Sequence, residues 1–135
     1  MAGISLATAQ QLIEAAAAKA TDIGVPMNVA VVDAGNNLTA FARQDGAWLG
    51  SIDIAQGKAY TARAFDMPTK DLVSEVQPGG SLYGIESSNQ GHLIVFPGGI
   101  PIKDGDEVVG AIGVSGGTVD QDQEVAEAAI AAYGR

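Results

Sequence analysis

The chain has no cysteine among its 135 residues. This absence excludes disulfides, thiolate metal sites, iron–sulfur clusters and covalently attached c-type haem. Histidine is nearly as scarce: His92 is the only one, so a multi-histidine metal site and a haem held by two histidines of one chain are excluded as well. Aromatic residues make up only 5% of the chain while glycine and alanine are abundant. We therefore expect helices and strands that pack closely on small side chains.

Positive charge is also in short supply. Seven lysines and arginines stand against sixteen aspartates and glutamates, which gives a net charge of −9. Such a chain repels nucleic acid and anionic membrane surfaces, and no run of basic residues overrides the repulsion. No apolar stretch is long enough to span a bilayer or to act as a secretion signal. We expect a soluble, cytoplasmic protein without nucleic-acid or membrane partners, folded as one domain over residues 1–135.

Hydrophobic periodicity predicts an α/β (α+β) domain. Ser5 can cap the first helix, and Thr118 with Gln121 forms the capping box of the last one. The predicted helices cover residues 5–22, 51–65, 68–75 and 119–133, and the predicted strands cover 28–33, 38–43, 92–96, 100–103 and 107–115. Residues 77–91 carry turn signals without a period, which predicts an irregular loop of a length that often serves function.

Glycine is concentrated between residues 98 and 118. The spacing matches neither the dinucleotide-binding nor the P-loop fingerprint, and no lysine follows it. Most of these glycines are explained by turns and by close backbone approach inside a strand. The remaining segment, Ser115, Gly116 and Gly117, precedes a predicted helix, where a small carboxylate or phosphate could bind, although capped turns of this kind are common without ligands.

Lys58 is the most informative candidate for a functional residue. Helical phase places it between Ile54 and Phe65 on the apolar face of the predicted helix 51–65. A lysine there either reaches solvent along its methylene stem or meets an anion in a cavity, and the sequence leaves both open. If the anion is a ligand carboxylate, Lys58→Met should keep the fold and weaken ligand binding at least about tenfold.

Four further residues could contribute to a site. His92 lies where the loop meets the predicted strand 92–96, and its imidazole could be a metal ligand, a general base or a strand-end group bonded to the backbone. Arg43, at a strand end, could clamp a carboxylate or form an exposed ion pair. Tyr83 and Glu86 could line a site or tie the loop down.

An acidic set begins the last helix. Its members could suggest a cation site, but helix capping and a solvated face account for them better. The set comprises Asp120, Asp122, Glu124 and Glu127.

The sequence as a whole resembles the GlcG/HbpS-like family, which is related to the C-terminal domain of PduO-type cobalamin adenosyltransferases. The resemblance is carried by VAVVDAGNNLTAFARQDGA, by IDIAQGKAYTA, and by LYG followed by FPGGIPIKDGDEVVGAIGVSGGTVDQDQEVAEAAI. It implies a profilin-like domain with a five-stranded antiparallel sheet flanked by helices. It also implies homo-oligomers and, in several members, non-covalent haem binding or haem degradation.

One haem-ligating residue of the family cannot be assigned in this sequence. Some relatives offer a haem-ligating histidine from the first helix, and the corresponding helix here contains none. Only His92, or softer donors such as Tyr83, Met27 and Met67, could replace it.

Two functions are favoured by these features, ahead of a third, an assembly module without a ligand. The first is a small oligomeric protein that binds haem or a related tetrapyrrole. The second is a lyase, isomerase or deaminase for a small carboxylate metabolite, in which Lys58 or Arg43 binds the anion and His92 or Glu86 moves protons.

Overall fold

The computed structural model describes residues 3–133. Within them, three long helices and four strands follow one another along the chain, and three short 3₁₀ turns lie between the second helix and the third strand. In chain order these are α1 (Leu6–Ile23), β1 (Asn28–Asp33), β2 (Leu38–Arg43), α2 (Gly50–Phe65), η1 (Thr69–Leu72), η2 (Ile85–Ser87), η3 (Asn89–Gly91), β3 (Gly99–Asp104), β4 (Glu107–Ser115) and α3 (Val119–Ala132).

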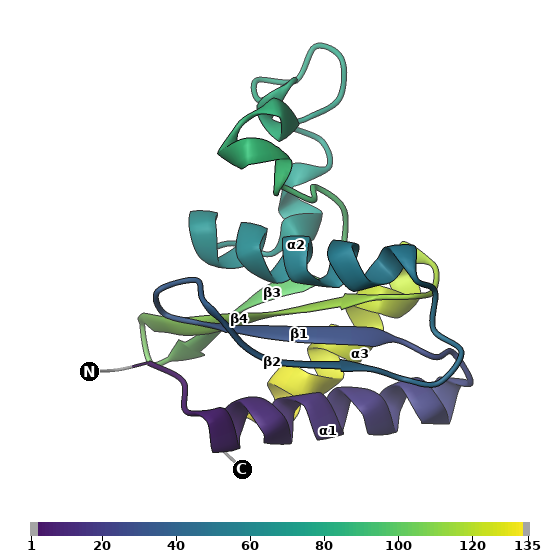
Figure 1. The fold of residues 1–135 in the computed structure, drawn as a ribbon. Helices are drawn as coiled ribbons and strands as arrows, with labels where there is room; N and C mark the ends of the chain where they lie inside the picture. The colour runs from purple at the N-terminus through teal and green to yellow at the C-terminus, as the bar shows by residue number, and fades with distance from the viewer. Residues whose placement is uncertain (1–2, 134–135) are drawn as a thin grey trace.

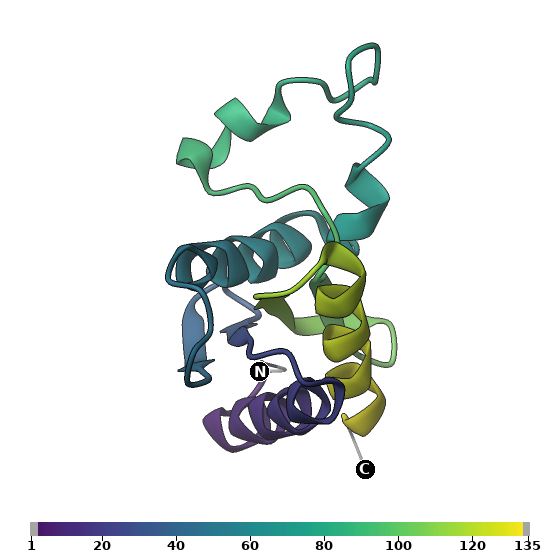
Figure 2. The same ribbon diagram turned by 90° about the vertical axis from the view of Figure 1, so that its right-hand side faces the viewer.

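The strands form one antiparallel sheet in the order β2-β1-β4-β3. Helices α1 and α3 pack together on one face and α2 covers the other (Figures 1 and 2). The alternation of side chains along the central strands divides the core accordingly. In β1, Val29 and Val31 pack toward α1 and α3, whereas Ala30 and Val32 pack toward α2. Few of the side chains between α2 and the sheet are larger than alanine, so the helix lies close to the strands.

The predicted helix ends are confirmed. The Ser5 hydroxyl accepts a hydrogen bond from the amide of Thr8, and Thr118 and Gln121 form both bonds of the capping box. The prediction of a helix over residues 68–75 is correct only in part, because a single 3₁₀ turn forms at η1. None of the helices in residues 3–133 is long and apolar enough to cross a membrane.

The expectation of five strands is wrong, since the described sheet has four. Residues 92–96, predicted as a strand, form none: His92 lies in a turn, residues 93–95 have no regular secondary structure, and Phe96 lies in a bend. Their backbone turns instead toward α2, where the amide of Ile94 donates to the Thr61 hydroxyl at 2.9 Å, and Leu93 is buried. The apolar run HLIVF therefore packs against α2 instead of entering the sheet. Its composition alone does not distinguish these two outcomes.

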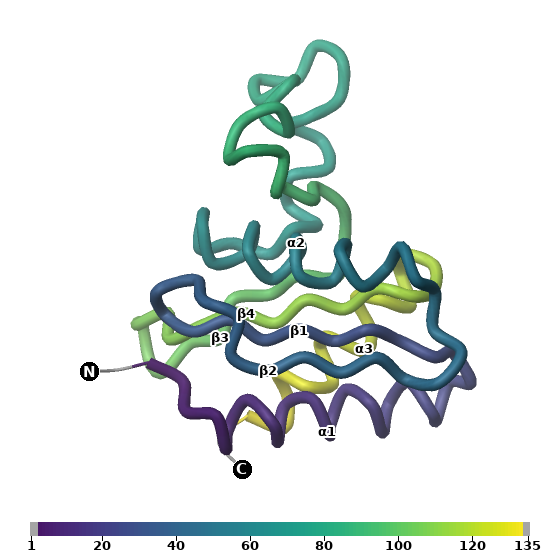
Figure 3. Tube along the Cα trace, in the orientation of Figure 1, coloured from purple at the N-terminus to yellow at the C-terminus, as the bar shows by residue number. Residues whose placement is uncertain are grey.

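Residues 77–91 form an arm that projects from the sheet and its helices (Figures 1 and 3). The arm contains η2 and η3 and is held together by short-range backbone bonds such as Tyr83 to Gly80 and Ile85 to Leu82. Leu82 and Tyr83 are exposed on it. The predicted irregular loop is thus present, with single helical turns inside it.

Candidate functional site

Lys58 is the largest fully buried side chain of the described residues. Its ammonium lies 2.8 Å from Asp122 Oδ2 and donates to the carbonyl oxygen of Val114, also at 2.8 Å. The Phe96 ring lies against the same group, with Nζ 5.0 Å from the ring centroid. The possibility that Lys58 reaches solvent is therefore wrong, because its whole length is covered. It meets an anion, and that anion belongs to the chain itself.

Asp122 is the residue that the sequence analysis misjudged. It is only 2% exposed, so its interpretation as part of a solvated face is wrong, although Asp120, Glu124 and Glu127 are exposed as expected. Asp122 shares a face of α3 with the buried Val125, Ala126 and Ala129, at the helical spacings of three, four and seven residues. Its position directs the carboxylate inward, toward Lys58.

The glycine turn before α3 completes this buried arrangement. The amide of Gly117 donates to Asp122 Oδ1 at 2.9 Å, while Oδ2 pairs with Lys58. Ser115 is buried at the end of β4, and a side chain at Gly116 would overlap the carbonyl of Pro26. The turn where the sequence allowed either a ligand anion or a capped turn without ligand thus holds an internal carboxylate.

Burial is the largest cause of the pKa shifts of Lys58 and Asp122. It lowers the pKa of Lys58 from its ordinary value of 10.5, while the charge and hydrogen bond of Asp122 act in the opposite direction. It raises the pKa of Asp122 from its ordinary value of 3.8, while Lys58 and the backbone amides of Gly117 and Gly116 oppose the change. Burial therefore favours the neutral forms, and the contact between the groups favours the ions.

These shifts predict how stability changes with pH. Just above pH 3.8 the folded chain keeps a proton on Asp122 that the unfolded chain has lost, so the free energy of unfolding falls as pH rises there. Just below pH 10.5 the folded chain has lost a Lys58 proton that the unfolded chain keeps, so the free energy of unfolding rises with pH. Urea unfolding across this range, with Lys58→Met/Asp122→Asn as reference, measures both slopes. Slopes of the opposite sign would show that the ionic attraction outweighs desolvation.

A second polar region surrounds His92 in a cleft of about 270 Å³. One wall is the face of α2 that carries Asp53, Gln56 and Tyr60, and the other walls come from the β1–β2 turn and residues 91–94. The Tyr60 and His92 rings lie 5.6 Å apart at an interplanar angle of 52°. Residues 91–94 can approach α2 this closely because position 57 is glycine, where a Cβ would overlap Ile94.

Asn36 supplies an unused hydrogen-bond acceptor at the wall of this cleft. Its backbone is left-handed, with φ of 64°, which asparagine tolerates better than most residues. The side-chain nitrogen donates to the carbonyl of Tyr60 at 3.1 Å. The side-chain oxygen is shut off from solvent and has no donor among the described residues. The cleft itself combines apolar walls with the polar side chains of α2 and one imidazole.

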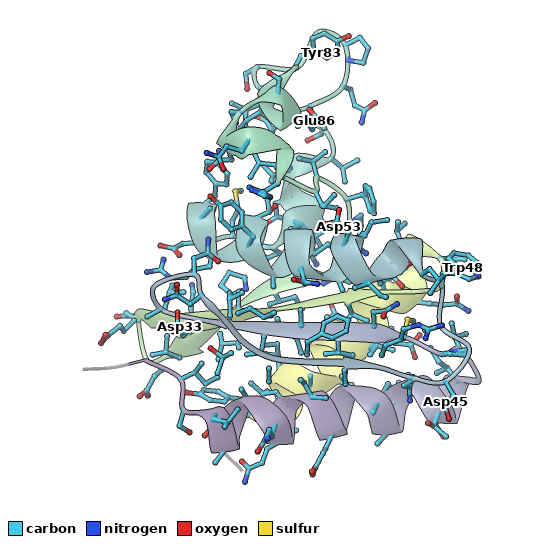
Figure 4. All side chains as sticks on the ribbon, viewed as in Figure 1. Asp33, Asp45, Trp48, Asp53, Tyr83 and Glu86 are labelled. Carbon is cyan, nitrogen blue, oxygen red and sulfur yellow. The ribbon has the colours of Figure 1, made fainter. Side chains whose placement is uncertain are left out.

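The other predicted residues lie apart from both regions. Arg43, at the end of β2, donates from Nε to the carbonyl of Ala47 and borders a separate open hollow with Gln44 and Asp45. Tyr83 and Glu86 are both exposed on the arm, far above the sheet (Figure 4). The structure thus joins Lys58 with the turn at 115–117 and leaves His92, Arg43 and the arm residues in three other places. Within residues 3–133, no group of three or more histidines and carboxylates could hold a metal ion.

Sequence reasoning missed Tyr60, Asn36 and Asp122. For Asp122 a signal was present in its helical phase with Val125 and Ala129. Tyr60 lies on the same helical face as Asp53 and Gln56, but nothing in the sequence indicates that residues 91–94 cover that face. Asn36 lies in the turn between β1 and β2, and its contact with α2 depends on tertiary packing, so no local pattern indicates it.

Comparison with solved structures gives close matches over nearly the whole chain. The Klebsiella pneumoniae protein ORFY is 45% identical and superposes with a TM-score of 0.94, covering 96% of this chain and 90% of its own. A chain crystallised as a PduOC:haem complex is 39% identical, with a TM-score of 0.94 and coverage of 98% and 96%.

Among curated proteins, the corrinoid adenosyltransferase PduO of Citrobacter freundii is 41% identical over 129 residues. The match spans 96% of this chain and only 38% of PduO. Residues 4–131 match the family model described as "Haem degrading protein HbpS-like". The match confirms the resemblance inferred from the sequence motifs, and the chain belongs to the HbpS-like family.

Proposed function

We propose that this chain binds haem non-covalently through the His92 cleft. The observation that carries the proposal is the match, over almost the full length of both chains, to a relative crystallised as a haem complex. Haem would supply iron that can bind and reduce oxygen species. The family description names haem degradation, which would use this iron chemistry.

The residues of the cleft fit a tetrapyrrole in part. His92 is exposed and is the only histidine of the chain, so its imidazole can reach an iron atom from the cleft wall. Val32, Leu38 and Ile94 offer apolar contact to a macrocycle edge. Met27, a softer donor suggested by the sequence, is fully buried and unavailable without rearrangement. His92 is therefore the ligand best supported by the geometry.

A haemin titration tests the proposal. We expect the wild type to shift the Soret band, and His92→Ala to bind at least about tenfold more weakly because one axial bond is lost. Tyr83→Phe serves as a control, since it removes a phenol oxygen that the sequence offered as an alternative donor, and this residue lies on the exposed arm, outside the cleft; the variant should bind as the wild type does. No Soret shift in the wild type would refute haem binding. Normal binding by His92→Ala would refute only the assignment of the ligand.

The alternative of an enzyme acting on a small carboxylate receives less support. Lys58, its strongest anion-binding candidate, already contacts Asp122, the Val114 carbonyl and the Phe96 ring. A substrate carboxylate would have to displace Asp122 from a site closed to solvent.

We also propose that the protein is a cytoplasmic homo-oligomer. In a chain of net charge −9, residues 77–91 carry a single charged residue, Glu86. Exposed Leu82 and Tyr83 on this arm offer apolar surface that a second copy could cover.

A further inference from the structure

His92 lies where the arm returns to the body of the domain, and helix α2 holds the chain on both sides of it (Figure 1). Before His92, the Tyr60 hydroxyl donates to the side-chain oxygen of Asn89 at 3.1 Å. After it, the amide of Ile94 donates to the Thr61 hydroxyl at 2.9 Å. Both bonds come from successive residues of one helix, so together they place the backbone of His92 against α2.

The turn that leads into His92 has an unusual backbone. Asn89, Gln90 and Gly91 have φ values of 50°, 56° and 76°, so three successive residues lie in the left-handed region. This region is unfavourable for residues that carry a Cβ, as two of the three do. Local hydrogen bonds close the turn, among them the bond from the amide of His92 to the carbonyl of Asn89. The Tyr60 hydroxyl, 29 residues away in the sequence, then ties the turn to α2.

The Tyr60 side chain also contacts the imidazole itself. The two rings lie 5.6 Å apart at an interplanar angle of 52°, which is the separation and tilt of a favourable aromatic pair. His92 is exposed, and an exposed side chain has few neighbours to limit its rotation. Both rings line the same cleft. One side chain therefore holds the backbone before His92 through its hydroxyl and the imidazole through its ring.

We propose that Tyr60 is a positioning residue for His92, which holds the imidazole at the cleft in position to bind a haem iron. The proposal deepens the haem-binding function proposed above and rests on it. A histidine that binds a metal is ordinarily oriented by a neighbouring group of the protein. Without the Tyr60 hydroxyl, the turn before His92 should take up several positions, and only some of them direct the imidazole into the cleft.

Nuclear magnetic resonance tests the orientation without haem. His92 is the single histidine, so its two carbon-bound ring protons are observed without overlap from another imidazole. In the wild type, the adjacent Tyr60 ring should shift these protons from the positions of a free histidine. Tyr60→Phe keeps a ring but loses the hydroxyl, and we expect both signals to move toward the free-histidine positions. Tyr133→Phe is the matched control, because Tyr133 packs with α1 and α3 on the other face of the sheet, and it should leave both signals unchanged.

Haemin titration measures whether this orientation affects binding. We expect Tyr60→Phe to bind haemin about three- to tenfold more weakly than the wild type, the usual effect of one lost hydrogen bond. In a His92→Ala background, the same substitution should change the affinity by less than about twofold, because Tyr60 then has no imidazole to position.

Substitutions of Asn89 separate the hydrogen bond from the strain of the turn. Asn89→Gly removes the acceptor and leaves a residue that adopts the left-handed region freely. It should weaken haemin binding as much as Tyr60→Phe does, and the double variant should be little worse because both changes remove the same bond. Asn89→Asp keeps an oxygen for the Tyr60 hydroxyl and should restore most of the affinity that Asn89→Gly loses. Circular dichroism verifies that all variants are folded.

The two measurements can fail independently. If the wild type gives no Soret shift, haem binding is refuted, and the ring signals of His92 alone decide the role of Tyr60. If Tyr60→Phe leaves those signals unchanged, the positioning role is wrong whether or not haemin binds. Equal weakening of haemin binding by Tyr60→Phe in the wild type and in the His92→Ala background would also overturn it, since Tyr60 would then act on haem without His92.

Discussion

Replacing Lys58 with methionine is expected to lower the free energy of unfolding by about 3–5 kcal/mol, the usual loss when one partner of a buried ion pair is removed. The substitution leaves the Asp122 carboxylate buried without its cation, and it deprives the Val114 carbonyl of a donor. Urea unfolding followed by far-ultraviolet circular dichroism at neutral pH measures the effect. This result replaces the expectation from sequence that Lys58→Met would chiefly weaken ligand binding.

The double variant Lys58→Met/Asp122→Asn separates the cost of an orphaned charge from the value of the pair. It removes both charges while an amide oxygen remains to accept from Gly117, so we expect it to recover most of the stability lost in the single variant. Lys70→Met is the matched control, because Lys70 is exposed and lies 4.0 Å from Glu127, and it should change stability by less than about 0.5 kcal/mol. A Lys58→Met variant as stable as the wild type would mean that the pair does not form in solution.

Gly113→Ala should be the most damaging single-methyl change, at about 3 kcal/mol or more. In the register of the sheet, Ala30, Gly113 and Gly99 form a row of small residues directly beneath α2. A Cβ at position 113 would overlap the backbone of Ala55 and Ala59. Backbone atoms cannot move aside as a flexible side chain can, so the whole helix must shift from the sheet.

The control for Gly113→Ala is Gly50→Ala at the beginning of α2. No atom lies within 4 Å of a Cβ built there, and the same methyl group should be neutral or stabilise the chain slightly. Thermal unfolding of both variants gives the comparison. Equal stability of Gly113→Ala and Gly50→Ala would contradict the close packing of α2 on β4.

The sequence predicted most of the fold because its signals were local. Ser5, Thr118 and Gln121 mark helix ends through contacts within four residues, and the β1–β2 hairpin follows from its own turn. The prediction of a strand at 92–96 was wrong because an apolar segment can pack on a helix as readily as it can enter a sheet. Composition alone does not separate these outcomes.

The site was predictable only in part for a similar reason. The phase of Lys58 placed it on the apolar face of its helix but left open whether it reaches solvent or meets an anion. The anion, Asp122, lies 64 residues away, and an aspartate in the first turns of a helix has an ordinary explanation as a dipole-stabilising residue. The cleft at His92 depends on three segments that meet only in the folded chain, the β1–β2 turn, α2 and residues 91–94. No local sequence pattern indicates that these three segments come together.

The long separation between Lys58 and Asp122 also constrains the order in which the chain can fold during its synthesis. Helix α2 carries a cation on the face that it must bury, and its counterion belongs to α3, which is made after all the other helices and strands in residues 3–133. The strand against which α2 lies most closely, β4, is likewise the last of the four to be made. Until both have emerged, docking α2 would bury an unpaired ammonium, which is strongly unfavourable. Helix α2 and the strands made before it should therefore remain open until α3 has emerged, and then fold with β4 and α3 in one concerted step.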